Sequence, residues 1–93
     1  MTAKSERQAA RQTIASYHQE QLGQLLLHVS DALADFHAGQ LDAFGVDRVL
    51  FQYSRAAKEL WKFCNFDDVE FAASLVHESS PIDWWQRGTL KPH

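Results

Sequence analysis

Residues 46–65, VDRVLFQYSRAAKELWKFCN, contain the clearest helical pattern of this 93-residue chain. At about 100° per residue, apolar side chains gather on one side of such a helix, and charged ones gather on the other. The apolar side consists of Val46, Val49, Leu50, Tyr53, Ala57, Leu60, Trp61 and Cys64. This spacing predicts an amphipathic helix that packs against another helix, with Trp61 as its largest apolar contact. Phe51 departs from the pattern because it falls among the polar residues.

The preceding residues predict a longer helix, from about residue 4 to residue 38. Its apolar stripe, which returns every three or four residues, consists of Ile14, His18, Leu22, Leu25, Val29, Leu33 and Phe36. Gly39 is placed to end this helix, and Asp42 is placed to cap the next one, which begins at about residue 43. The connection is short, so the two helices are expected to form an antiparallel hairpin.

Two shorter helical segments are predicted after the hairpin. Asp67 and Glu70 have the spacing of a capping box, which predicts a third helix over about residues 67–79. Pro81 lies at a second helix start and predicts a short helical turn over about residues 81–87, which carries two adjacent tryptophans. The predicted fold is therefore all-α, with a long helical hairpin over 4–38 and 43–65 followed by these two segments.

Length and composition fit one helical domain over residues 1–93, with residues 1–12 expected to fray and 89–93 to form a loose tail. The formal net charge is −3, which argues against a general nucleic-acid binder. One cysteine cannot form an intramolecular disulfide, and the polar N-terminus lacks the apolar region of a signal peptide. No apolar run is long enough for a membrane span, so a cytoplasmic location is expected.

The leading functional expectation is a small non-enzymatic interaction or regulatory protein that associates with itself or with a protein partner. The first helix would be about 45 Å long and the second about 30 Å, so the first outruns its neighbour. Either the third helix and the tryptophans cover the rest of its stripe, or another chain does. The candidate partner-binding residues are Leu27, Phe51, Arg55, Lys58, Lys62, Trp84 and Trp85.

Charge segregation supports an alternative function. Residues 13–45 and 66–80 contain acids but no lysine or arginine, whereas the second helix is net positive. The simpler interpretation is that a basic helix packs between two acidic segments, with Arg55 also paired to Glu59 within its own helix. The alternative is a nucleic-acid-associated regulator that uses the basic residues Arg48, Arg55, Lys58 and Lys62.

No catalytic residue, cofactor or metal site is predicted. His28, Asp31 and Asp35 share one side of the first helix, a spacing that can hold a metal ion but is also ordinary on a solvated helix. His18 lies in the apolar stripe, where a neutral imidazole in a core or interface is the usual arrangement. Cys64 is expected to be a small buried apolar residue. A small helical hydrolase or nuclease that uses histidines of the first helix is the least favoured alternative.

Overall fold

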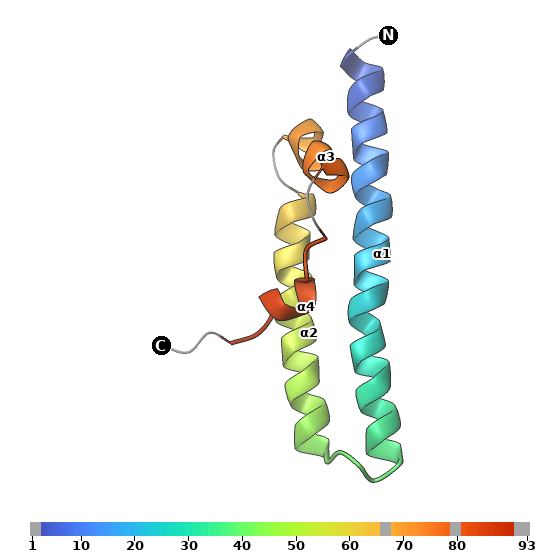
Figure 1. Ribbon diagram of the computed structural model, residues 1–93, viewed down its shortest axis with the longest axis vertical. Coiled ribbons are helices and arrows are strands. Elements are labelled where there is room, and N and C mark those ends of the chain that lie inside the picture. The colour runs from blue at the N-terminus through green and yellow to red at the C-terminus, as the bar shows by residue number, and fades with distance from the viewer. Residues whose placement is uncertain (1–2, 66–67, 79–80, 91–93) are drawn as a thin grey trace.

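The structure is a computed structural model that describes residues 3–65, 68–78 and 81–90. Over these residues it contains four helices and no strand, namely α1 (Ala3–His37), α2 (Ala43–Cys64), α3 (Val69–Glu78) and α4 (Trp84–Arg87). Figure 1 shows α1 and α2 side by side and antiparallel, α3 beyond the end of α2, and α4 in front of α2. The predicted all-α fold is confirmed. Along the described helices, none combines the length and the apolar composition that a membrane span requires.

The hairpin turn forms through the two residues that the sequence singled out. Gly39 has φ +77°, a left-handed conformation that glycine adopts without steric cost. The next amide, that of Gln40, donates to the carbonyl of Asp35 at 2.8 Å. The Asp42 carboxylate then accepts a 2.8 Å hydrogen bond from the amide of Gly45 and caps α2. These two local bonds fix the direction in which α2 returns along α1.

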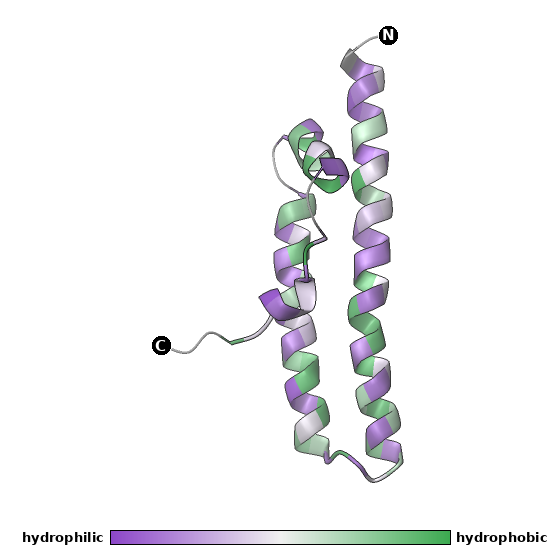
Figure 2. Cartoon of the chain, in the orientation of Figure 1, coloured by the Kyte–Doolittle hydropathy of each residue, from purple (hydrophilic) through white to green (hydrophobic). Residues whose placement is uncertain are grey.

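The core consists of two clusters along α1. Toward the N-terminus, α1 and α3 bury Ala10, Ile14, Ala72 and Ala73 against each other. Farther along, α1, α2 and α4 enclose Leu25, Ala56, Leu60 and Trp84. The third helix therefore covers the part of α1 that extends beyond α2, which is one of the two arrangements that the difference in helix length left open. Figure 2 shows the corresponding change along α1, from mostly hydrophilic first turns to more hydrophobic residues beside α2.

The starts of the two short helices differ from the predicted ones. Asp67 lies outside the described residues, and the Asp68 carboxylate accepts the 3.0 Å hydrogen bond from the amide of Phe71 at the start of α3. The fourth helix begins at Trp84 rather than at Pro81. Its cap is Asp83, whose carboxylate accepts from the amide of Gln86 at 3.1 Å. In each case a carboxylate accepts a hydrogen bond from the amide three residues later, as a helix N-cap does.

The apolar side of α2 is only partly covered. Leu60 is fully buried, but Trp61 and Leu50 are exposed, as is Leu33 on α1. The prediction that Trp61 supplies a large contact inside the hairpin is therefore wrong. Each helix has an apolar arc wider than the strip that its neighbour covers, so one edge of each arc stays in solvent.

Candidate interaction surface

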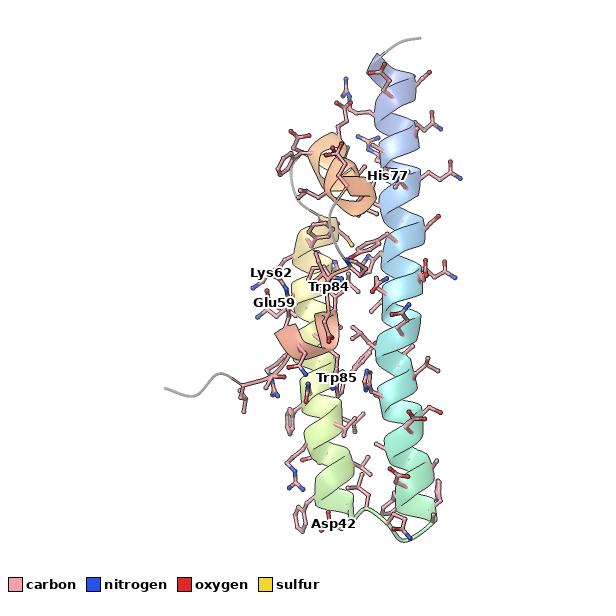
Figure 3. The ribbon with its side chains drawn as sticks, in the orientation of Figure 1. Asp42, Glu59, Lys62, His77, Trp84 and Trp85 are labelled. Carbon is pink, nitrogen blue, oxygen red and sulfur yellow. The ribbon has the colours of Figure 1, made fainter. Side chains whose placement is uncertain are left out.

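Two tryptophans, Trp84 and Trp85, hold α4 against the hairpin. Trp84 is 4% exposed, and its indole Nε1 donates a 2.8 Å hydrogen bond to the hydroxyl of Tyr17. The Trp85 ring stacks on the imidazole of His28, with ring centroids 4.0 Å apart and planes 3° apart. Figure 3 shows both tryptophans in the space between α2 and α1. Trp84 therefore belongs to the core, and Trp85 attaches α4 to α1.

The residues around Gly88 attach the same segment to α2. Arg55 Nε donates a 2.6 Å hydrogen bond to the carbonyl of Gly88, and Gln52 Nε2 donates to the carbonyl of Trp85 at 2.9 Å. A Cβ at Gly88 would lie 2.5 Å from the carbonyl oxygen of Gln52, so only glycine fits this close approach. Arg55, predicted as a partner-binding residue, is thus engaged within the chain rather than paired with Glu59.

A cleft of about 370 Å³ lies on this side between α1, α3 and residues 81–82. Burial raises the pKa of the Tyr17 hydroxyl above its usual 10.0, so this group stays protonated over the neutral range. The residues that line the cleft are Tyr17, Glu20, Gln21, Gln24, Phe63, Leu75, Val76, Pro81 and Ile82. Such a lining offers hydrogen bonds and apolar contact, with Glu20 as its one acidic group.

His28, Asp31 and Asp35 share one side of α1, with a spacing that can hold a metal ion although no site is predicted there. His28 faces Trp85, while Asp31 and Asp35 are exposed. Within residues 3–65, 68–78 and 81–90, no three His, Cys, Asp or Glu side chains come close enough together to hold a metal ion. His18 is half-buried and lies on another surface, which is described below.

The outer side of α2 carries the basic residues, with Phe51 exposed among them. Lys62 pairs with Glu59 at 3.3 Å, and Figure 3 shows both side chains on the side of α2 away from α1. Lys58 is exposed. Leu27 is exposed on the outer side of α1, so the structure does not bring it together with Phe51.

A different surface lies opposite α4, and we call it the uncharged face. It consists of Ala15, His18, Gln19, Leu22, Leu26, Val29 and Leu33 of α1 and Val46, Leu50, Ser54, Ala57 and Trp61 of α2. Four of its large apolar side chains are exposed, at 49% for Leu26, 42% for Leu33, 44% for Leu50 and 58% for Trp61. Although 23% of the chain is charged, this face contains no Asp, Glu, Lys or Arg.

Helical periodicity places both halves of the uncharged face on one side of the hairpin. Going around α1 from the buried Leu25, His28 lies about 60° in one direction and Leu26 about 100° in the other. On α2, Gln52 and Trp61 likewise lie on opposite flanks of the buried side. His28 and Gln52 are contacts of the α4 segment, so Leu26 and Trp61 lie on the opposite surface. In Figure 1, α4 lies in front of the hairpin, so the surface opposite α4 faces away from the viewer.

The α1 half of this face has a shallow, open depression, which we call the α1 groove. A groove of about 510 Å³ is lined by Ala15, His18, Gln19, Leu22, Gly23 and Leu26. A Cβ added at Gly23 would meet no atom within 4 Å. Glycine inside a helix costs about 0.5–1 kcal/mol relative to alanine. Packing within the described part of the chain therefore gives no reason for glycine at this position.

The sequence pattern does not predict the uncharged face, although it places Leu50 and Trp61 on one apolar side of their helix. A signal was present, because Leu22, Leu26 and Leu33 widen the stripe of α1 toward a flank that has no charged residue over residues 13–37. Comparisons with known proteins add no functional information: no family model matches the chain, and no curated protein or solved structure is significantly similar to it.

Proposed function

We propose that this chain is a non-enzymatic helical interaction module whose working surface is the uncharged face. The observation that carries the proposal is the exposure of Leu26, Leu33, Leu50 and Trp61 on one side of the hairpin, among residues without charged groups. Monomers rarely expose contiguous apolar patches larger than a few hundred Å², and larger ones mark sites of association. The fitting partner is a protein surface built from apolar helical side chains, since nucleic acid requires cationic groups.

Two adjacent leucines provide a matched test. Leu26 is on the uncharged face, and Leu27 is on the outer side of α1 with an even larger exposed fraction, 62%. We expect Leu26→Glu, but not Leu27→Glu, to change either the molecular mass in sedimentation or the binding of the apolar dye bis-ANS per chain. An open face binds dye, and an associated face is covered, so one of the two measurements must respond. If both variants match the wild type in both measurements, the proposal fails.

The basic side of α2 supports the nucleic-acid alternative less well. Arg55 is bonded to the Gly88 carbonyl and Lys62 is paired with Glu59, which leaves Arg48 and Lys58 as the exposed cations of this helix without such a bond in the described structure. Electrophoretic mobility of a labelled oligonucleotide at low salt tests this alternative. Retardation that Lys58→Glu abolishes would favour it over the interaction module.

A further inference from the structure

We propose that the partner on the uncharged face is a second copy of this chain, and that Trp61 of each copy enters the α1 groove of the other. The product is an antiparallel four-helix bundle with α3 and α4 on its two outer sides. This inference rests on the proposed function, because it names the partner of the same surface.

The dimensions of the chain fit association with a second copy. The chain exposes 7054 Å², whereas a folded monomer of its mass exposes about 5,500 Å². Its Cα radius of gyration is 16.3 Å, whereas a compact domain of this length has about 12 Å. The excess surface is larger than the ~800 Å² that one partner contributes to a standard interface. A second hairpin that covers ~800 Å² of the uncharged face would remove about half of this excess.

The chemistry of the face fits a copy of itself. An isologous interface uses the same surface on both copies. Each charged group on that surface would therefore be buried twice, once in each copy. The uncharged face contains no Asp, Glu, Lys or Arg, and two copies can therefore meet without burying an unpaired charge. The charged residues of α1 and α2 remain in solvent in this arrangement.

The register of the hairpin places Trp61 beside the groove of the second copy. The Tyr17 and Phe63 rings are 5.8 Å apart, so these residues lie at the same level along the bundle. At 1.5 Å per residue, Trp61 is then level with about residue 19, in the middle of the groove. A two-fold axis parallel to the helices lays α2 of one copy over α1 of the other at the same level, with all neighbours antiparallel. The indole ring of Trp61 from the second copy then approaches Gly23, where the absence of a side chain leaves space for the ring.

Equilibrium sedimentation of the full chain with two face variants and one control tests the inference. We expect a wild-type dimer, and a dissociation constant raised roughly a hundredfold by Leu26→Glu and by Gly23→Leu, with no change for Leu27→Glu. Gly23→Leu is the sharper variant, because leucine favours helix and meets open space in the single chain but fills the groove. Circular dichroism checks that each variant keeps its helices.

Disulfide trapping tests the register separately. In a Cys64→Ser background, a chain carrying Gln19→Cys is mixed with a size-tagged chain carrying Trp61→Cys. We expect a mixed disulfide to form rapidly, because these positions face each other across the proposed interface. Leu27→Cys mixed with Trp61→Cys is the control and should cross-link only slowly. Equal rates for the two mixtures would overturn the proposed register.

The outcomes separate this inference from the proposed function. A wild-type chain that stays monomeric from micromolar to millimolar concentration overturns the second copy as partner. In that case the proposed function still stands if Leu26→Glu lowers dye binding and Leu27→Glu does not. A dimer that Leu26→Glu and Gly23→Leu leave intact overturns the inference, because association then uses another surface.

Discussion

The indole Nε1 of Trp84 donates a 2.8 Å hydrogen bond to the hydroxyl of Tyr17, which lies 67 residues earlier in the chain. This bond joins the last helix to the first. The centroids of the Trp84 and Phe63 rings are also 5.4 Å apart. The Arg87 guanidinium lies 5.5 Å from the centroid of the Trp84 ring. A four-residue helix has no independent stability, so α4 persists only because such contacts hold it.

Removal of the Tyr17 hydroxyl is expected to destabilise the protein. Tyr17→Phe leaves the Nε1–H of the buried Trp84 without its acceptor. An unsatisfied buried donor costs about 1–3 kcal/mol, and we expect a loss in that range in urea unfolding followed by circular dichroism.

Tyr53→Phe is the matched control, because Tyr53 is half-buried on α2 and its hydroxyl makes no hydrogen bond within the described structure. We expect this control to change the free energy of unfolding by less than about 0.5 kcal/mol. Equal losses for the two variants would show that the Trp84 bond contributes nothing specific.

Gly88→Ala is expected to displace the C-terminal segment from α2. The added Cβ would lie 2.5 Å from the carbonyl oxygen of Gln52 and 2.7 Å from the amide nitrogen of Ala56, and neither backbone atom can move without distorting the helix. Overpacking of this kind costs typically about 1–3 kcal/mol. Gln86→Ala, an exposed change in the same short helix, is the control. Protease cleavage after Arg87 should accelerate in Gly88→Ala alone.

Asp42→Ala is expected to lower stability by about 1 kcal/mol, since the carboxylate satisfies the amide of Gly45 in the first turn of α2. Asp31→Ala removes an exposed acid of α1 that has no capping role and should leave stability nearly unchanged. The measurement is the urea midpoint of unfolding of each variant, compared with that of the wild type. A loss as large in Asp31→Ala would mean that net charge, rather than the cap, sets the effect.

The hairpin could be predicted from the sequence because its determinants are local. Gly39 and Asp42 act within a few residues of their own positions, and the 3.6-residue period of α1 and α2 extends over many turns. The predicted start of α4 at Pro81 is wrong for a related reason. Pro81 and Asp83 are both favourable near a helix start, and only the bond from the Gln86 amide to Asp83 selects between them.

The uncharged face could not be located from periodicity alone. An apolar arc shows that a helix has a buried side, but the neighbouring helix covers only part of that arc, and the covered part depends on how the two helices rotate toward each other. Trp61 and Leu60 are adjacent and both apolar, yet one is 58% exposed and the other is fully buried. In the same way, no local feature distinguishes Trp84 from Trp85, which differ in their partners on α1.

The thiol of Cys64 leads to a prediction about alkaline pH. Cys64 lies where the two core clusters meet, and burial raises its pKa from 9.0 to about 11. The folded state therefore holds the thiol proton more tightly than the unfolded state does. The resulting stabilisation is complete below about pH 9 and is lost as the pH rises toward about 11.

We expect urea midpoints of the wild type to fall more steeply over this range than those of Cys64→Ala. The Tyr17 hydroxyl, whose pKa is also raised by burial, is present in both proteins, so the difference between their slopes isolates the thiol. Parallel slopes would show that the thiol proton is bound equally in the folded and unfolded chains.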